Sequence, residues 1–483
     1  MEPKAGAQIS RKAFIQSVLI LLALMIVAGV LTRVVPAGSY ARTIRDEREI
    51  IEPQSFRLVE RPHYPIWRWL TAPVEVLWGP DALTIITIII FILMIGSAFA
   101  VLDRSGILKA ALARVVSTFG ERKYLLLLVI SFLFMLVGAF FGIFEEVVPL
   151  VPVMIALSYF LGWDSLVGLG MSILATNMGF SAAVTNPFSI GVAQEIAGLP
   201  LFSGAWLRII IFIVVYAVFA TFLVRYARRV ERDPHASPVF EEDRAERAKY
   251  EPLQLDRLSE ENPRLGKAIG WFLAFFILII LVLVAGPFLP AISQFALPIV
   301  GLLFFIGGVG AGFVSGARGK AVLQAVREGI SGIAPGIPLI LMAASIKHIV
   351  AQGGIMDTIL HSASLTFSQA SPFLAALIVY VLALLIEFFI GSASAKAFLM
   401  MPILIPLADL VGVTRQVTVT AYCFGDGFSN MAYPTNPVLL ICLGLTVVTY
   451  PKWLKWSLKL WFWVILITAA FLWLAVAINF GPF

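Results

Sequence analysis

Long apolar runs with few charges alternate with short polar segments along the whole chain. Runs close to 20 residues are what an α-helix needs to cross a hydrocarbon core of about 30 Å. The pattern predicts full spans at 14–35, 82–102, 206–226, 268–287, 292–314, 330–350 and 456–480. We therefore expect an all-α polytopic membrane protein.

Two further apolar stretches, 124–161 and 371–411, are too long for one span and carry polar residues in the middle. Each is predicted to form a re-entrant helical hairpin that enters and leaves on the same side of the membrane. The tips of these hairpins are expected at 138–146 and 391–396, where the polar residues lie.

The triplet Thr-Asn-Pro occurs twice, at 185–187 and 435–437, and the two copies are 250 residues apart. Both lie inside apolar stretches, 165–199 and 414–449, which are predicted to be broken transmembrane helices because Pro interrupts helical hydrogen bonding. A polar break at membrane depth is tolerated only where it is buried in protein or lines a cavity. Two unrelated kinks remain the alternative, but paired breaks in matching halves are typical of a transporter site within an internal repeat.

Lys and Arg residues beside the spans predict the topology. They place the N-terminus, segment 103–123 and a charged linker on the cytoplasmic side, and parity then places the C-terminus outside. The two halves of the chain are therefore expected to be inverted in the membrane. The predicted organisation is a first inverted repeat at 1–226, a solvated linker without its own core at 227–267, an extra helix at 268–287 and a second repeat at 288–483.

Composition supports the membrane assignment and narrows the chemistry. The chain has 483 residues, 60% of them hydrophobic and 13% charged, whereas soluble domains average about 45–50% and about 25%. The two cysteines lie in apolar stretches, which implies no disulfide framework. The four histidines are scattered and no nucleophile–base pair is evident, so we expect no catalytic residue, no cofactor and no metal ion other than Na⁺. The net charge of +6 is modest and gives no reason to expect a nucleic-acid partner.

The residue types around the two breaks suit recognition of a small solute. Asn supplies a donor and an acceptor, and Thr and Ser supply hydroxyls. The N-termini of half-helices favour anionic groups, whereas free carbonyls favour cations. Pro187 and Pro437 are expected to start the second half-helices, where a missing N–H costs little. The candidates for substrate binding here are Asn177, Ser181, Thr185, Asn186, Pro187, Asn430, Thr435, Asn436 and Pro437. The candidates for ion coupling are Gly142, Thr176, Asp426, Gly427 and Ser429, with Asp426 as a ligand of Na⁺ or H⁺.

Charged and hydroxyl side chains at the predicted hairpin tips complete the candidate site. Glu145 and Glu146 lie near the first tip, and Lys396 matches Glu146 at the 250-residue offset. Ionisable groups at membrane depth are costly and indicate function. They could contact an ion or a charged substrate, or they could form an internal Glu–Lys pair that holds the hairpins. Ser392 and Ser394 could offer hydroxyls to a carboxylate.

Three other acidic residues, Asp164, Glu387 and Asp409, are expected near membrane edges with mainly structural roles.

Several motifs resemble one family of carriers. They are Pro36-Ala-Gly-Ser-Tyr40, Phe144-Glu-Glu-Val-Val-Pro149, Gly425-Asp-Gly-Phe-Ser-Asn430 and Tyr433-Pro-Thr-Asn-Pro437. On these motifs the chain resembles the YfcC-like family of the anaerobic four-carbon-dicarboxylate carriers, within the ion transporter superfamily. The resemblance implies a homodimer in the inner (plasma) membrane of a bacterium or archaeon, with a scaffold domain and a transport domain that moves as an elevator. It also implies small carboxylate substrates, either dicarboxylates or amino acids such as arginine and ornithine, coupled to Na⁺ or H⁺ or to exchange.

The sequence therefore predicts a secondary active transporter. The hairpins and broken helices are expected to form the transport domain, and helices 14–35, 82–102, 292–314 and 330–350 most of the scaffold. Lys396 is the one clear basic group expected at membrane depth, whereas Glu145, Glu146 and Asp426 are acidic. This charge balance favours a zwitterionic or cationic amino acid as substrate, or coupling to a cation. An ion channel and a membrane-embedded enzyme are the alternatives. Hairpins that stop midway argue against a channel, and the lack of a nucleophile or metal cluster argues against an enzyme.

Overall fold

A computed structural model describes residues 11–45, 48–52, 54–119, 122–248, 262–285, 289, 295–367 and 370–481. Within these residues, ten helical segments are long and apolar enough to cross a membrane, which confirms the multi-pass prediction. Their burial differs: Phe14–Val34 is 22% buried, whereas Ser165–Ile196 is 100% buried. The first of these segments therefore exposes an apolar surface suited to lipid, and the second lies wholly within protein.

The first half of the chain leads from the N-terminal span to the linker. Its elements are α1 (Arg11–Val34), β1 (Gly38–Ser39), β2 (Arg42–Arg45), β3 (Arg48–Ile51), β4 (Arg57–Leu58), α2 (Arg68–Glu75), α3 (Ala82–Arg104), α4 (Ile107–Phe119), α5 (Lys123–Phe141), η2 (Glu145–Leu150), α6 (Val151–Phe160), α7 (Ser165–Leu169), η3 (Gly170–Leu174), α8 (Ala175–Ala182), η4 (Pro187–Gly191), α9 (Val192–Ile196), α10 (Ala205–Arg232), η5 (Pro234–Ala236) and α11 (Phe240–Arg247).

The second half follows the linker and repeats the same order of long helices, hairpin and broken helix. Its elements are α13 (Leu265–Ala285), α15 (Ala296–Val314), α16 (Gly319–Ile333), α17 (Gly336–Gln352), α18 (Met356–Phe367), α19 (Pro372–Glu387), α20 (Ala393–Leu410), α21 (Arg415–Phe428), α22 (Pro437–Gly444) and α23 (Tyr450–Ala477).

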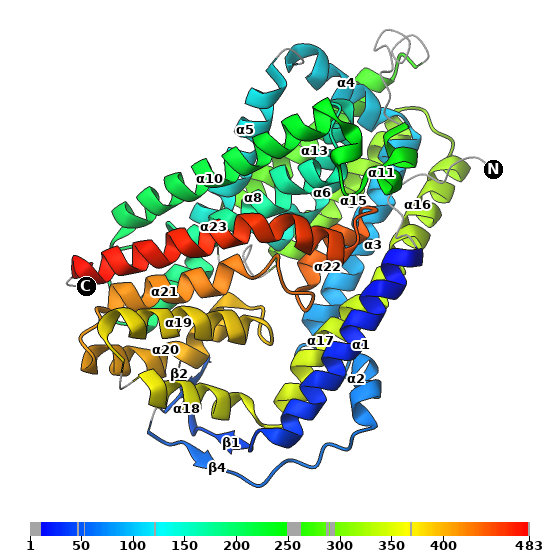
Figure 1. Ribbon diagram of the computed structural model, residues 1–483. Helices are drawn as coiled ribbons and strands as arrows, with labels where there is room; N and C mark the ends of the chain where they lie inside the picture. Colours follow the sequence, from blue (N-terminus) through cyan, green and yellow to red (C-terminus); the bar gives the residue numbers. More distant parts are fainter. Residues whose placement is uncertain are drawn as a thin grey trace.

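The most extensive helix contacts involve both halves of the chain (Figure 1). Helix α3 lies against α15 and α16, α13 packs on α15, and α1 runs along α17. Helix α5 packs on α8, α19 on α21, and the long helices α10 and α23 lie against each other. The two broken helices meet where α8 contacts α21. The halves that precede the two Thr-Asn-Pro segments therefore pack against each other.

The predicted span 330–350 is wrong at its start. The chain is helical from Gly319, and α16 and α17 are separated at Ala334 and Pro335. Pro335 lacks the N–H that would continue the helical hydrogen bonds, so the helix is interrupted there. Of the other predicted spans, residues 286–287 and 292–294 lie outside the described residues.

Both hairpin turns are shorter than the predicted tips. In the first hairpin, α5 continues through Gly138 to Phe141, and the turn occupies 142–144. In the second, the turn occupies 388–392. Lys396 therefore lies in the first turn of α20 and not in the hairpin turn. Its side chain is buried within the protein.

The described residues are mainly helical, as predicted, but the loop after α1 also contains two small sheets that the all-α prediction missed. Strand β1 pairs antiparallel with β4, and β2 pairs antiparallel with β3. The backbone N–H of Tyr40 donates to Asp357 of α18 at 2.9 Å, and Arg42 forms an ion pair with the same carboxylate at 2.9 Å. This loop is therefore anchored on α18, the connecting helix of the second half (Figure 1).

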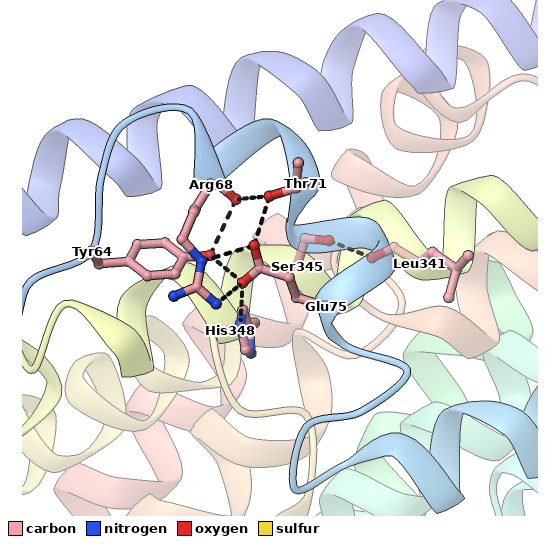
Figure 2. A network of polar contacts seen from close by, with 7 residues as sticks. All are labelled: Tyr64, Arg68, Thr71, Glu75, Leu341, Ser345 and His348. Carbon is pink, nitrogen blue, oxygen red and sulfur yellow. Dashed lines mark hydrogen bonds and ion pairs between the residues drawn. The ribbon is translucent and has the colours of Figure 1, made fainter.

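A second polar network holds α2 against α17 (Figure 2). Arg68 binds both carboxylate oxygens of Glu75, at 3.0 and 2.7 Å, and Thr71 donates to Glu75 at 2.6 Å. His348 of α17 reaches the same carboxylate at 3.3 Å. Burial alone would raise the pKa of Glu75, but hydrogen bonds from Arg68, Thr71 and His348 bring it down to about 2. Glu75 is therefore charged at any physiological pH and ties the loop to the helix group of α1 and α17.

The start of the linker is packed, which corrects the expectation of a solvated connection. Val239 is fully buried, and Asp243 of α11 is 2% exposed. Asp243 accepts hydrogen bonds from the Tyr159 hydroxyl at 2.8 Å and from the backbone N–H of Ser165 at 2.7 Å. Asp164, which caps α7, accepts from Ser237 at 2.6 Å. We call residues 234–248 the linker clasp; residues 249–261 lie outside the described part of the chain.

The linker clasp is expected to loosen as the pH rises from 6 to 8. Burial, helped by the negative charge of Asp164, raises the pKa of Asp243 to about 7. An acid whose pKa is raised by docking binds more protons in the docked state, so docking is strongest in acid and weakens as the pH rises through that pKa. The undocked fraction is expected to increase about tenfold between pH 6 and 8. The undocked fraction can be measured by amide hydrogen exchange of residues 240–247, corrected for the intrinsic exchange rates.

Two substitutions separate this proton effect from general weakening of the clasp. Asp243→Asn is expected to flatten the pH dependence. Glu242→Gln removes the ion pair with Lys452 (2.5 Å) and should weaken protection equally at both pH values. A clasp whose protection is the same at pH 6 and 8 in the wild type would contradict the prediction.

Candidate functional site

The first Thr-Asn-Pro segment joins two half-helices end to end. Helix α8 ends at Ala182, Ala183 adopts a left-handed conformation (φ 44°), and Pro187 starts η4. The side-chain oxygen of Asn186 accepts from the backbone N–H groups of Phe188 at 2.9 Å and Ser189 at 3.3 Å. Asn is a preferred N-cap because its oxygen satisfies donors that the helix itself leaves free. The sequence prediction that Pro187 begins a half-helix is confirmed.

The second segment is arranged in the same way. Pro437 starts α22, as predicted, and the Asn436 side-chain oxygen accepts from Val438 N–H at 2.9 Å and Leu439 N–H at 3.4 Å. The two caps differ in one respect. The Asn436 amide nitrogen donates to Asn430 at 2.9 Å, whereas the buried amide nitrogen of Asn186 has no hydrogen-bond partner among the described residues. Asn186 therefore retains a buried donor that the described residues do not use.

The first break lies against the tips of both hairpins. Thr185 donates through its N–H to Ala139 at 3.1 Å and through its hydroxyl to Phe140 at 2.9 Å, both at the end of α5. From the second hairpin, the Ser394 hydroxyl donates to the carbonyl of Phe188 at 2.9 Å. The predicted neighbourhood of the hairpin tips and the first Thr-Asn-Pro segment is thus present in the fold.

Gly142 allows the first hairpin to turn directly onto Asn186. Its φ of 67° is a conformation that L side chains rarely adopt, and a Cβ there would lie 2.2 Å from the Asn186 side-chain oxygen. Glycine is therefore required both by the backbone and by the space. This explains the residue type without giving Gly142 a direct contact to an ion.

Side chains of the first broken helix face the second break. The Asn177 amide nitrogen approaches the carbonyl of Phe428 at 3.5 Å, and a Cβ on Gly427 would lie 2.4 Å from the Ser181 hydroxyl. The hydroxyls of Thr176, Ser181 and Ser429 donate within their own helices at 2.8–3.1 Å. Their oxygens keep acceptor capacity, since a hydroxyl carries two lone pairs.

Some accessible surface lies at the breaks and at the hairpin tips. Within the two Thr-Asn-Pro triplets, Thr185, Pro187, Thr435 and Pro437 are partly exposed, although the helices that flank them are almost entirely buried. Glu145 and Ser392 at the hairpin turns are exposed, and Glu146 and Ser394 are partly exposed. Ser392 caps α20 by accepting from Ala395 N–H at 3.4 Å. These residues supply accessible polar surface at the breaks and tips.

The charged candidates separate into two places. Glu146 accepts from the N–H of Phe144 in its own turn, at 3.3 Å. Lys396 lies instead against Glu387 and against Asp426, the latter at 2.6 Å. The alternative of an internal Glu–Lys pair is therefore realised with Glu387 and not with Glu146. Glu387 is 3% exposed and belongs to this cluster through its contact with Lys396, a partner that the sequence analysis did not predict for it.

The other two acids stay in supporting positions. Asp409 forms an ion pair with Arg415 at 2.7 Å at an exposed site. Asp164 receives the linker clasp and is 2% exposed.

Arg208 is a site residue that the sequence reasoning did not single out. It is fully buried on α10 and donates to three carbonyls: Val184 at 3.2 Å, Phe202 at 3.1 Å and Ser203 at 2.9 Å. Val184 lies in the first break, where its carbonyl has lost its helical partner. The signal was available, since an Arg inside an apolar span is costly and must be paired.

The chain is similar to known proteins over most of its length. The family model described as C4-dicarboxylate anaerobic carrier, DcuC, matches residues 14–477. The chain belongs to the DcuC family. It is therefore a membrane transporter and not an enzyme.

Two curated relatives match most of the chain. One, from Escherichia coli (strain K12) and named "Putative basic amino acid antiporter YfcC", is 31% identical over 486 residues, covering 92% of this chain and 93% of the relative. An "Uncharacterized protein" of Haemophilus influenzae is 27% identical over 420 residues, covering 86% of this chain and 79% of the relative. The crystal structure of the Alcanivorax borkumensis YdaH transporter, described as having an unusual topology, matches with a TM-score of 0.42 at 20% identity, over 97% of this chain and 100% of that one. A likeness at that level says nothing further about this DcuC-family member.

Proposed function

We propose that this DcuC-family protein is a secondary active carrier of a small carboxylate-bearing solute. The solute is an amino acid, such as arginine or ornithine, or a dicarboxylate. The E. coli relative is named for basic amino acids, and the family model for C4-dicarboxylates. Both classes share a carboxylate, and a helix N-terminus favours anionic groups of this kind.

The observation that carries the proposal is the free amide donor of Asn186. It is fully buried, it sits at the N-terminus of a half-helix, and it has no partner among the described residues. A carboxylate placed there would accept from the Asn186 side chain and meet the positive end of the helix dipole. The exposed Glu145 lies at the neighbouring hairpin turn. A cationic group of an amino acid would be favoured there, which supports the basic amino acids over the dicarboxylates.

The transport cycle proposed for this site is an elevator motion of a transport domain formed by the hairpins and broken helices. Support comes from the repeated order of elements in the two halves and from the packing of α8 on α21, which ties both broken helices into one group. The inverted repeats, the cytoplasmic N-terminus, the outside C-terminus and a homodimeric scaffold belong to the same proposal. Coupling is to Na⁺, to H⁺ or to exchange of solutes.

A serine substitution tests the site. Asn186→Ser keeps a preferred N-cap oxygen but removes the amide donor. Losing a hydrogen bond to a charged group costs about 1.5–3 kcal/mol, so the KM for the transported solute should rise about ten- to hundredfold while the protein stays folded. Counterflow in proteoliposomes with arginine, ornithine, neutral amino acids and succinate identifies the solute and measures KM.

The matched control is Thr414→Ser, another N-cap change, located at the start of α21. It should leave KM unchanged. A wild-type KM in Asn186→Ser would remove this donor from the site, and absence of counterflow with every solute would overturn the proposed function.

A further inference from the structure

Three charged side chains form a cluster inside the second half of the chain. Lys396 of α20 is fully buried, Asp426 of α21 is 1% exposed and Glu387 at the end of α19 is 3% exposed. The Lys396 ammonium is in contact with Glu387 and lies 2.6 Å from an Asp426 carboxylate oxygen. We call these residues the buried triad.

The buried triad joins the parts that the proposed motion uses. Glu387 precedes the turn of the second hairpin, and Lys396 follows it in the first turn of the other arm. Asp426 belongs to the second broken helix, four residues before Asn430. A Cβ on Gly391, within the hairpin turn, would lie 3.8 Å from a Glu387 oxygen. The triad therefore sits directly behind the hairpin tip and beside the second break.

The formal charges of the triad do not cancel. Two carboxylates and one ammonium leave a net charge of −1 at a place with almost no access to water. An uncompensated buried charge is strongly unfavourable. One Asp426 oxygen contacts the Lys396 ammonium, whereas the other has no hydrogen-bond partner among the described residues. The cluster is therefore one positive charge and at least one donor short.

The surrounding groups do not supply that charge. Among the described residues, side chains that interact electrostatically with Asp426 include Tyr422 and Cys423 on α21 and Glu145 on η2. Arg208 on α10 interacts with Cys423, and its guanidinium donates to three backbone carbonyls. Tyr422 donates its hydroxyl to Ala393, and neither it nor Cys423 carries positive charge. Glu145 adds negative charge. Among the described residues, no hydrogen bond or ion pair from a second cation to Glu387 or Asp426 supplies the missing positive charge.

We infer that the missing cation is a proton, shared between Glu387 and Asp426, and that the buried triad is the proton-coupling site of the carrier. Na⁺ fits less well because Lys396 already occupies the position between the carboxylates, and a metal ion beside an ammonium is repelled. A proton from one aqueous phase binds a carboxylate oxygen, makes the triad neutral, and leaves to the other phase after the transport domain has moved. The neutral triad can cross the hydrocarbon region more cheaply than the charged one.

This inference rests on the proposed function, and the test separates the two. Proteoliposomes are clamped at zero membrane potential with valinomycin and equal K⁺, using arginine, ornithine or succinate, whichever shows counterflow. In the wild type, solute flux should change the internal pH reported by a trapped dye. A pH gradient of one unit, worth about tenfold in concentration, should drive solute redistribution, whereas a Na⁺ gradient should not.

Replacing each carboxylate of the buried triad by an uncharged amide tests whether that side chain carries the proton. Glu387→Gln and Asp426→Asn should each lower the ratio of protons to solute moved at least tenfold. Glu387→Asp keeps a titrating group and should keep the ratio. Asp409→Asn, at the exposed acid of the same hairpin, should also keep the wild-type ratio.

The results of these experiments distinguish failure of the proton site from failure of the proposed carrier function. Counterflow driven by Na⁺ without a pH change in the wild type overturns the proton site and leaves the carrier function standing. Wild-type proton ratios in Glu387→Gln and Asp426→Asn also overturn it. If the neutral variants fail to fold, the wild-type proton flux and the Glu387→Asp variant still test the proton site. The pH optimum of transport is expected to shift in Glu387→Asp. An unshifted optimum would count against the buried triad as the proton site. No counterflow with any solute defeats the proposed function itself.

Discussion

Lys396→Met is expected to destabilise the protein by about 3–5 kcal/mol, because it leaves two buried carboxylates without their positive partner. Methionine matches the length of the lysine stem, so little packing is lost. The remaining cost is electrostatic: Glu387 and Asp426 would have to take up protons or remain charged inside the protein. Such a variant should be recovered in low yield, or unfold well below the wild-type temperature.

The two free cysteines report this unfolding directly. Cys423 is 2% exposed and Cys442 is fully buried, so a thiol-reactive dye labels them only when the helices open. The temperature of half-labelling should fall strongly in Lys396→Met. In the triple variant Glu387→Gln/Lys396→Met/Asp426→Asn it should return most of the way, since replacing a whole buried ion cluster is often close to neutral.

Lys452→Met provides the matched control for this comparison. It breaks an ion pair with Glu242 whose side chains are 34% and 25% exposed, and pairs near the surface contribute only about 0–1 kcal/mol. Equal shifts in Lys396→Met and Lys452→Met would show that the triad is not an electrostatic cluster in the folded protein.

The local features of the candidate site could be predicted from the sequence. Asn followed by Pro has one good solution at a helix start: the Asn oxygen caps the turn, and the Pro needs no donor. Asn186 and Asn436 both adopt it. Span lengths could be predicted for the same reason, since they depend on a run of neighbouring residues and a fixed rise per residue. The start of the predicted span 330–350 was misplaced, because Pro335 separates α16 from α17 within that apolar run.

Long-range partners were harder to predict. The repeat offset places Glu146 opposite Lys396, but residues related by a repeat occupy equivalent positions and need not touch. Lys396 pairs with Glu387 and Asp426 because α19, α20 and α21 pack together. Likewise, the charged linker looks solvated by composition, yet Asp243 finds donors on Tyr159 and Ser165, 84 and 78 residues away. Such contacts depend on the assembled fold and leave little local signal.

A single methyl group at the contact between α5 and α8 should disrupt both stability and transport. A Cβ on Gly179 would lie 1.8 Å from the carbonyl oxygen of Met135, and a Cβ on Gly138 would lie 2.2 Å from that of Thr176. The obstacles are backbone atoms, which cannot rotate away, so Gly179→Ala must push the two helices apart. Overpacking of this kind typically costs about 1–3 kcal/mol.

The effect on transport should exceed the effect on stability, because both helices lead directly to the site. Helix α5 ends at the turn where Gly142 contacts Asn186, and α8 ends at the first break. A displacement of about 1 Å at a binding site can cost on the order of 100-fold in rate. We therefore expect Gly179→Ala to lower solute counterflow at least tenfold. Gly270→Ala in α13, whose Cβ would meet nothing within 4 Å, should keep wild-type counterflow and gain up to about 1 kcal/mol from helix propensity. If both variants transport equally well, the close approach of α5 and α8 does not position the site.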